Sequence, residues 1–169
     1  DTTVDDIARA AHVAKGTVYL YYRSKDEILR QLLESDLAEL RGATLPAIAD
    51  AGSFEDRMRR YVTATLEFFE RKRDLIEHCQ LELGPDARRK VKVILGQLYR
   101  EQTEAWTQVL RYAAADGTVS AGDVEGIAAH LVGMARGLAL QRLAGWCQDP
   151  IDVCATRASG LLWKGLATR

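Results

Sequence analysis

The sequence is poor in proline, cysteine and aromatic residues. It has 3 Pro and 3 Cys among 169 residues, and aromatic residues make up 7%. So few prolines, together with a steady helical rhythm of apolar residues, predict an all-α protein. The cysteines Cys79, Cys147 and Cys154 lack metal-type spacing, which favours reduced thiols.

No apolar run is long enough to span a bilayer and no signal-peptide pattern is present, so we expect a cytoplasmic protein without a membrane partner.

The chain also lacks a strong net charge. Its formal net charge is −1, which argues against a protein that coats nucleic acid. The basic residues are instead concentrated in the segment 9–30, where Asp26 and Glu27 oppose them. A locally positive segment on a nearly neutral body is typical of sequence-specific rather than nonspecific DNA binding. The basic residues of this segment are Arg9, Lys15, Arg23, Lys25 and Arg30.

Signals for catalysis, metal binding or a cofactor are missing. We find no serine in a nucleophile elbow, no glycine loop that would cradle a phosphate and no convincing pair of acids, so we expect no enzyme activity. His78 and Glu82 lie four residues apart on one helical face, but a third ligand is not evident. We therefore predict neither a metal nor a cofactor.

The most informative segment is 3–33, which predicts two short helices, a tight turn and a longer helix. Thr3 is a good N-cap with Asp6 at the third helical position, an arrangement that resembles a capping box. His12-Val13-Ala14 is short enough only for a turn, and Lys15 opens the second helix. This order is a helix-turn-helix pattern, in which the second helix enters the major groove of DNA.

The residues expected to contact DNA lie at two helix starts. Base contacts come from the N-terminal part of the second helix, and Gly16 lets the backbone approach a phosphate or sugar. Ser24 to Glu27 is a second capping box, so Lys25 lies at a helix N-terminus that attracts phosphate. The predicted DNA-contacting residues are Thr3, Lys15, Gly16, Thr17, Tyr19, Tyr21 and Lys25.

Residues 3–33 resemble the DNA-binding region of TetR-family transcriptional repressors. The usual family pattern is T-V-x-x-I-A-x-x-A-G-V-S-K-G-x-x-Y-x-H-F-x-S-K-x-x-L. The matching residues are Thr3, Ile7, Ala8, Ala11, Val13, Lys15, Gly16, Thr17, Tyr19, Tyr22, Ser24, Lys25 and Leu29. The match covers about a fifth of the chain, and the remainder fits the family only by helix number and length.

Several positions depart from the family pattern. His12 replaces the usual Gly, which predicts strain or a different backbone conformation in the turn. Ala14 replaces the usual Ser cap, and Tyr21 replaces a His. The family has another helix before Thr3. We therefore interpret the sequence as N-terminally incomplete and expect compromised DNA binding as it stands.

The rest of the chain is divided by caps, Gly and Pro. We expect a helix from Lys25 to near Gly42, before Pro46, and a helix capped by Ser53. Further helices are expected over 74–83, from Asp86 to before Gly117, after the cap at 120–123, and after Asp149-Pro150, with Asp149 as cap. The predicted domains are a helix-turn-helix DNA-binding domain, residues 1–42, and a ligand-binding and dimerisation domain, residues 43–169.

The middle helices contain more large, partly polar side chains than a minimal core needs. The resemblance implies an inducer pocket here, and the aromatic residues suggest an aromatic or lipophilic ligand. Packing in an ordinary core is the alternative for each residue. The predicted pocket residues are Met58, Tyr61, Thr65, Phe69, His78, Tyr99, Trp106 and Met134.

The last two helices are rich in small residues, which lets helices approach closely. The resemblance implies a homodimer built on a four-helix bundle from these helices. Packing within one subunit is the alternative. The predicted interface residues are Gly126, Gly133, Gly137, Cys154, Ala158, Leu161 and Leu162.

The leading functional hypothesis is a ligand-responsive transcriptional repressor, a homodimer that a small-molecule inducer releases from a palindromic double-stranded operator. The first alternative is a DNA-bound architectural or division factor of the same fold without an inducer. The second is a helical ligand-binding or interaction protein whose DNA-reading segment no longer functions. A cavity between the middle helices favours the repressor, whereas a filled core favours the first alternative.

Overall fold

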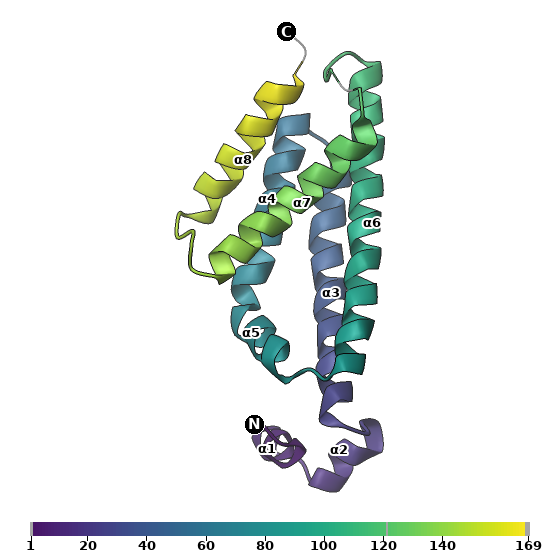
Figure 1. The fold of residues 1–169 in the computed structure, drawn as a ribbon, viewed down its shortest axis with the longest axis vertical. Coiled ribbons are helices and arrows are strands. Elements are labelled where there is room, and N and C mark those ends of the chain that lie inside the picture. The colour runs from purple at the N-terminus through teal and green to yellow at the C-terminus, as the bar shows by residue number, and fades with distance from the viewer. Residues whose placement is uncertain (1, 121, 168–169) are drawn as a thin grey trace. The chain divides into compact units, whose positions relative to one another are not determined.

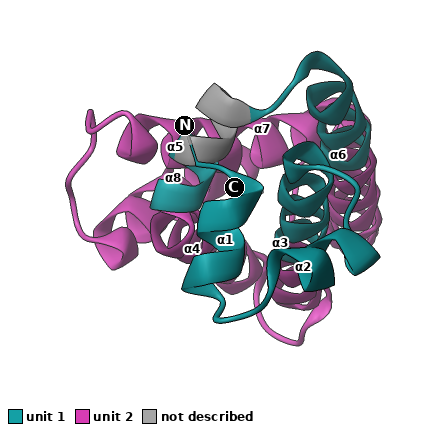
Figure 2. Cartoon of the chain, turned by 90° about the horizontal axis from the view of Figure 1, so that it is seen from below, with its two compact units in different colours: residues 1–38, 74–96 teal, residues 39–73, 97–169 magenta. Residues whose placement is uncertain are grey.

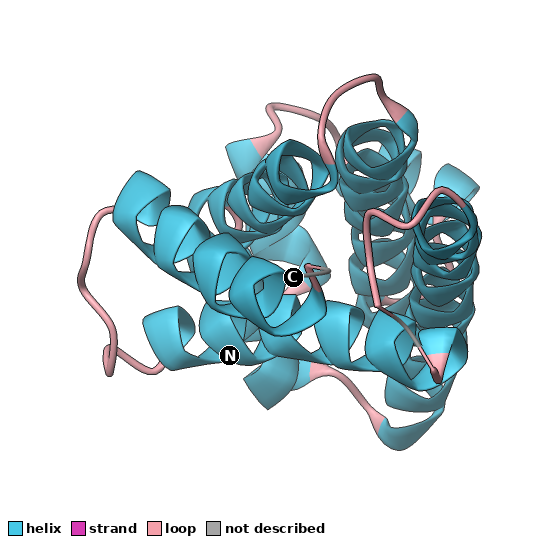
Figure 3. Cartoon of the chain, turned by 90° about the horizontal axis from the view of Figure 1, so that it is seen from above, coloured by secondary structure: helices cyan, strands magenta, loops and turns pink. Residues whose placement is uncertain are grey.

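A computed structural model describes residues 2–120 and 122–167, except for the side chains of residues 78–82. Within these residues the chain forms eight α-helices joined by loops, as Figures 1 and 3 show. The predicted all-α fold is therefore confirmed. The helices are α1 (Val4–Ala10), α2 (Lys15–Tyr21), α3 (Lys25–Ala49), α4 (Phe54–Arg71), α5 (Arg73–Glu82), α6 (Pro85–Ala115), α7 (Val124–Leu143) and α8 (Ile151–Leu166).

The chain divides into two compact units, which Figure 2 colours separately. Unit 1 contains residues 1–38 and 74–96, and unit 2 contains residues 39–73 and 97–169. The long helices α3 and α6 each contribute residues to both units. The sequence pattern placed the division at residue 42 and did not indicate that residues 74–96 pack with the N-terminal segment. The functional boundary at residue 42 stays a prediction.

Unit 1 has a small apolar core of its own. Leu29 on α3 packs with Leu83 and Ala87, and all three side chains are buried. A Cβ atom added at Gly84 would lie 2.5 Å from Asp26 Oδ2, so the turn between α5 and α6 lies directly against the first turn of α3. This contact and the core around Leu29 place the start of α6 against the start of α3.

Unit 2 contains the main core, in which α4 packs against α7 and α8. Trp106 is fully buried at its centre and makes edge-to-face contacts with Phe54 and Tyr61, both with ring centroids 5.6 Å apart. Ala135 and Ala155 are also fully buried. Their small side chains allow α7 and α8 to approach α4 closely.

The expected end of the third helix near Gly42 is wrong, because α3 continues through Pro46 to Ala49. A proline inside a helix removes one backbone hydrogen bond and costs about 3 kcal/mol. Burying an isoleucine side chain contributes about 1.5–3 kcal/mol, and Ile48 is fully buried in the main core. The Pro46 carbonyl also accepts a hydrogen bond from the Asp50 amide at 2.8 Å.

The caps at Thr3 and Ser53 are confirmed, since each side chain accepts a hydrogen bond from a backbone amide three residues later. In the segment 120–123 the capping residue is the last one, Asp123, whose side chain accepts from the Gly126 amide. The expected cap at Asp149 is wrong. Helix α8 starts at Ile151 with Pro150 as the N-cap and without a side-chain cap bond. The Asp149 carboxylate instead pairs with Arg157 at 2.9 Å.

Among the helices in the described residues, none combines the length and apolar character that crossing a membrane requires.

Candidate nucleic-acid interface and ligand site

Helix α1 starts with a complete capping box. Thr3 Oγ1 accepts a hydrogen bond from the Asp6 amide at 3.2 Å, and Asp6 Oδ2 accepts one from the Thr3 amide at 3.0 Å. The hydrogen bonds from Thr3 lower the pKa of the Asp6 carboxyl. The Thr3 hydroxyl is therefore engaged in the cap, although its residue remains exposed at the start of α1.

The turn between α1 and α2 takes a left-handed backbone at His12, where φ is 55°. The Val13 amide donates to the Ala8 carbonyl at 3.0 Å, and the His12 amide donates to the Arg9 carbonyl at 3.1 Å. These two bonds form a Schellman motif, in which glycine is the usual residue at the left-handed position. The departure from the family's Gly at this position is therefore accommodated by strain in the backbone and not by a different turn.

Helix α2 presents most of its surface to solvent. Gly16, Thr17, Tyr19 and Tyr21 are exposed, whereas Val18 is buried at 8% exposure. A Cβ atom at Gly16 would meet no atom within 4 Å, so the start of this helix is open to a close approach by another molecule. The predicted base-reading residues therefore lie together on accessible surface.

Lys15 has a partner that the sequence pattern did not indicate. Its Nζ lies 2.7 Å from Asp5 Oδ1 and 5.9 Å from the centroid of the Tyr19 ring. The hydrogen bond to Asp5 raises the pKa of Lys15. This ion pair joins α1 to α2, and it also places a carboxylate beside the cation expected to contact DNA.

The start of α3 carries the second predicted contact. Ser24 Oγ accepts from the Glu27 amide at 3.2 Å, and Glu27 Oε2 accepts from the Arg23 amide at 2.7 Å. The Glu27 carboxylate thus bonds to the amide of Arg23, one residue before the Ser24 cap, and not to the Ser24 amide as in a standard capping box. Lys25, the first residue of α3, is half-buried.

The predicted pocket residues come together in unit 2. Met58, Tyr61, Thr65 and Trp106 are almost completely buried, and Phe69, Tyr99 and Met134 are half-buried at the edge of the same core. The side chain of His78 lies outside the described residues. These residues thus lie in one core, and most of them fill space between the helices instead of lining a cavity, which is the arrangement expected for a factor without an inducer. Their role as pocket residues stays a prediction.

A series of hydrogen bonds between buried side chains, called the polar chain below, crosses this core. The sequence did not reveal it. Tyr61 Oη donates to Gln102 Oε1 at 3.2 Å, and Gln102 Nε2 donates to Thr44 Oγ1 at 2.8 Å. Thr44 Oγ1 donates in turn to the Leu40 carbonyl at 2.7 Å. Gln102 and Thr44 are 58 residues apart, so only tertiary packing brings them together.

Other polar groups in this region are partly or fully removed from water. The Arg136 guanidinium lies 5.0 Å from the centroid of the Tyr99 ring, and burial lowers its pKa. Burial also raises the pKa of Tyr61. Among the residues that the structure describes, the indole Nε1 of Trp106 is buried and has no hydrogen-bond partner. An unpaired buried donor is destabilising by about 1–3 kcal/mol, so it marks a position where a ligand acceptor would be favourable.

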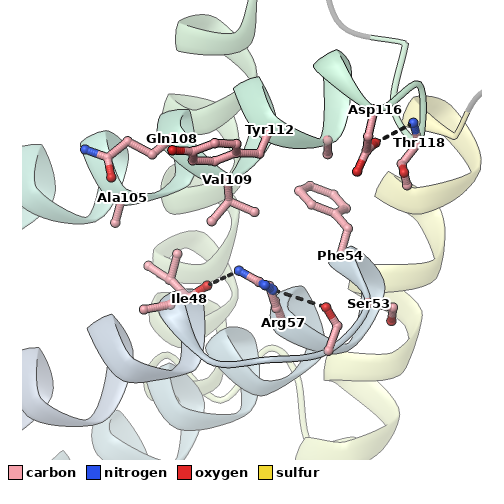
Figure 4. A pocket seen from close by; sticks show the side chains of 13 residues that line it. Ile48, Ser53, Phe54, Arg57, Ala105, Gln108, Val109, Tyr112, Asp116 and Thr118 are labelled. Carbon is pink, nitrogen blue, oxygen red and sulfur yellow. Dashed lines mark hydrogen bonds between the residues drawn. The ribbon is translucent and has the colours of Figure 1, made fainter.

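An open cavity of about 490 Å³ lies at one end of unit 2, where Phe54 forms part of its wall (Figure 4). Phe54 also contacts Trp106, so the cavity adjoins the predicted residues. Arg57 donates to the carbonyls of Ile48 and Gly52, both at 3.2 Å. None of the predicted pocket residues with a described side chain lines this cavity. Its lining residues are Ile48, Ala49, Gly52, Ser53, Phe54, Arg57, Ala105, Gln108, Val109, Tyr112, Ala113, Asp116 and Thr118.

The comparisons with known proteins agree with this geometry. Residues 1–32 match the family model described as "Bacterial regulatory proteins, tetR family". The N-terminal segment of the chain is therefore similar to the DNA-binding domain of TetR-family regulators. Its structure is similar to that of a TetR/AcrR-family regulator from Thermobifida fusca, with a TM-score of 0.73 and 22% identity over 97% of this chain and 86% of that one. It is also similar to FadR from Bacillus subtilis in complex with stearoyl-CoA, with a TM-score of 0.69 and 19% identity over 97% and 88%.

Similarity at the sequence level is moderate. The repressor KstR2 of Mycolicibacterium smegmatis is 25% identical over 69% of this chain and 57% of its own length. The regulator YhgD of Bacillus subtilis is 31% identical over 40% of this chain and 35% of its own length. The matches thus span about a third to just over half of these relatives.

The residues predicted for the TetR-type dimer interface separate into two groups. Gly133 and Leu161 are exposed, and Gly126, Gly137 and Leu162 are half-buried. Cys154 and Ala158 are buried beneath their own chain. The exposed large apolar residues from α7 to α8 are Leu140, Trp146, Val153 and Leu161.

Proposed function

We propose that this protein is a transcriptional repressor that binds a palindromic DNA operator as a homodimer and is released by a small-molecule inducer. The observation that carries the proposal is the exposed face of α2, which follows a Schellman turn and presents Gly16, Thr17 and Tyr19. In helix-turn-helix proteins the corresponding helix reads base edges in the major groove. The family assignment and the repressors among the relatives support this proposal.

DNA contacts divide into two types in this proposal. Thr17 and Tyr19 read bases, because they project from the exposed face of α2. Lys25 contacts a phosphate together with the free amides at the start of α3. Thr3, Gly16 and Tyr21 border this surface, and Lys15 joins it when it leaves Asp5.

A dimer is required to place two reading helices about 34–36 Å apart, the spacing of successive major grooves on one face of DNA. We assign the dimer contact to α7 and α8, because large apolar side chains are exposed along both helices and their connection. Leu140 and Leu161 are examples. Cys154 and Ala158 support this surface from beneath, since they are buried within the subunit.

The inducer is a lipophilic molecule with a polar group. Its apolar part enters the cavity beside Phe54, and its polar part reaches the buried donors of the adjoining core, among them the unpaired Trp106 Nε1. Relatives support this class, since one structural neighbour holds stearoyl-CoA and another is a ketosteroid regulator. An inducer releases DNA only if it binds the released state more tightly than the DNA-bound state. Helices α3 and α6 transmit the change, because each belongs to both units.

The DNA-binding proposal is tested by selecting an operator from random duplex DNA with the full-length protein and measuring affinity by fluorescence anisotropy. Thr17→Ala should relax base preference at one position per half-site by about 1–3 kcal/mol. Lys25→Ala should weaken binding to all sequences and reduce the slope of log affinity against log salt by about 1. Lys92→Ala, at an exposed position of α6, is the matched control. Unchanged base preference in Thr17→Ala would contradict the assignment of α2 as the reading helix.

The inducer proposal is tested by adding stearoyl-CoA, coenzyme A or a ketosteroid to the operator complex. We expect a lipophilic compound, and not coenzyme A alone, to release the DNA. Ala105→Leu fills the cavity and should weaken release, whereas Ala115→Leu on the exposed part of α6 should not. If none of the lipophilic compounds binds or releases DNA, the factor without an inducer becomes the better interpretation.

A further inference from the structure

Two cysteines meet at the connection between α7 and α8. Cys147 Sγ and Cys154 Sγ are 3.5 Å apart, and both thiols are free. Cys147 is half-buried and precedes α8, whereas Cys154 is buried in the first turns of α8. The local backbone fixes this approach, since Gly145 turns the chain with φ of 75° and the Cys154 amide donates to the Pro150 carbonyl at 3.0 Å.

We propose that Cys147 and Cys154 form an oxidative modification site, at which hydrogen peroxide converts the two thiols into an intramolecular disulfide. Sulfur atoms at 3.5 Å need only a small movement to reach bonding distance, about 2.05 Å. The third cysteine, Cys79, plays no part in the proposal.

A guanidinium lies beside the pair. Burial and the adjacent Cys147 thiol raise the pKa of Cys154, and Arg142 Nη1, 3.8 Å from Cys154 Sγ, opposes part of this rise because it stabilises a thiolate there. Arg142 is itself fixed by Glu70, at 3.0 Å, and by the Asp149 carbonyl. A guanidinium beside a thiol promotes its reaction with oxidants and disulfides.

The same charges disfavour a metal ion. The donor atoms of Cys147, Asp149 and Cys154 lie within 4.8 Å of one another, which is close enough for a shared cation. However, the Asp149 carboxylate is engaged by Arg157 at 2.9 Å, and Arg142 adds a further positive charge. A divalent cation would have to displace the ion pair between Asp149 and Arg157 and bind beside the Arg142 guanidinium.

The reaction proceeds in two balanced steps. The more accessible Cys147 thiolate attacks one peroxide oxygen, the O–O bond breaks, and the products are a sulfenic acid and hydroxide, which becomes water on protonation. The Cys154 thiolate then attacks the Cys147 sulfur, the S–O bond breaks, and hydroxide leaves to form a second water. Two thiols and one peroxide thus give one disulfide and two waters, and the two sulfurs together lose two electrons.

The sequence makes the test direct. Trypsin releases both cysteines in one peptide, residues 143–157, because no Lys or Arg lies between Arg142 and Arg157. Cys79 falls in a separate peptide, residues 74–88. The folded protein is treated with graded hydrogen peroxide, denatured, alkylated with iodoacetamide, digested and analysed by mass spectrometry.

The expected result is a 143–157 peptide that is lighter by two hydrogens than the reduced peptide, carries no alkyl group, and returns to the doubly alkylated form after dithiothreitol. Cys79→Ser should retain this behaviour. Cys147→Ser, at a half-buried position that tolerates a polar residue, should abolish it. The oxidised protein should unfold at a higher temperature than the reduced one, because the crosslink restricts the unfolded chain.

Three outcomes would overturn the proposal. In the first, both cysteines remain alkylated at peroxide concentrations that oxidise free cysteine. In the second, Cys147 is oxidised irreversibly to sulfinic acid without a disulfide. In the third, stoichiometric Zn²⁺ binds and protects both thiols from alkylation, and this protection is lost in Cys147→Ser. The last result would identify the cluster as a metal site.

Discussion

At the scale of single residues, His12 shows how one side chain can change the stability of a turn without altering its shape. The left-handed backbone at His12 disfavours any residue with a Cβ atom, by about 1–2 kcal/mol. His12→Gly should therefore raise the free energy of unfolding by up to about 1 kcal/mol, since glycine also gains some unfolded-state entropy. Urea denaturation measures the change. His12→Ala keeps the strain, so an equal gain in this variant would show that the imidazole and not the backbone is responsible.

Lys15 and Asp5 form the next residue-scale prediction. Asp5→Asn releases Lys15 from its ion pair and removes a negative charge from the surface proposed to contact DNA. DNA affinity should rise at low salt, and the slope of log affinity against log salt should steepen by about 1 if Lys15 gains a phosphate contact. Fluorescence anisotropy at several salt concentrations measures both. In a protein that already carries Lys15→Met, adding Asp5→Asn should leave the slope of log affinity against log salt unchanged. If the slope still steepens, Lys15 is not the cause.

The buried Tyr61 hydroxyl is expected to stabilise unit 2. Tyr61→Phe removes the hydrogen bond to Gln102 and leaves its Oε1 without that donor, which should lower the free energy of unfolding by about 1–2 kcal/mol. The double variant with Gln102→Leu should lose less than the sum of the single variants, because the partners share one interaction. Additive losses in urea denaturation would contradict the proposed polar chain.

At the scale of elements, α7 and α8 present an apolar surface that a dimer would cover. Leu161 is 68% exposed on α8. Leu161→Glu should convert the protein to a monomer, because a buried carboxylate without a partner is strongly unfavourable at an interface. Sedimentation velocity measures the oligomeric state. Val93→Glu is the matched control, since Val93 is 64% exposed but lies on α6. A Leu161→Glu protein that remains dimeric would place the interface elsewhere.

Some helix boundaries are set by neighbouring residues in the sequence, and others are set by tertiary packing. The starts of α1, α4 and α7 could be predicted, because Thr3, Ser53 and Asp123 cap amides only three residues away. The end of α3 could not be predicted from Pro46 alone. The helix continues past it because Ile48 is buried among residues distant in sequence.

At the scale of the whole molecule, ion pairs and caps predict loss of stability in acid. Each carboxyl concerned has a pKa below its ordinary value, 3.8 for Asp and 4.5 for Glu, chiefly through a hydrogen bond to a neighbouring side chain. These groups are Asp6, Glu39, Asp56, Glu70, Glu101, Asp116 and Glu125.

A lowered pKa in the folded state means that the stabilisation is complete above the unfolded pKa and is lost as the pH falls through the folded pKa. The unfolding temperature should therefore change little from carboxyl titration between pH 6 and 8 and fall progressively below about pH 4.5. Thermal unfolding followed by circular dichroism measures it. Glu101→Gln removes the pair with Arg41 and should flatten part of the fall. A midpoint that stays constant down to pH 3 would contradict the prediction.

The sequence by itself determined the features that arise within a few residues of the chain. These include the helical class, the cap at Thr3 and the turn at residues 12–14, because hydrogen bonds and periodicity act over one or two helical turns. Tertiary structure alone decided which distant residues meet. It paired Lys15 with Asp5 and joined Tyr61 to Thr44 through Gln102. It also grouped residues 74–96 with the N-terminal helices. Such contacts depend on how complete helices pack, and no local pattern in the sequence specifies that packing.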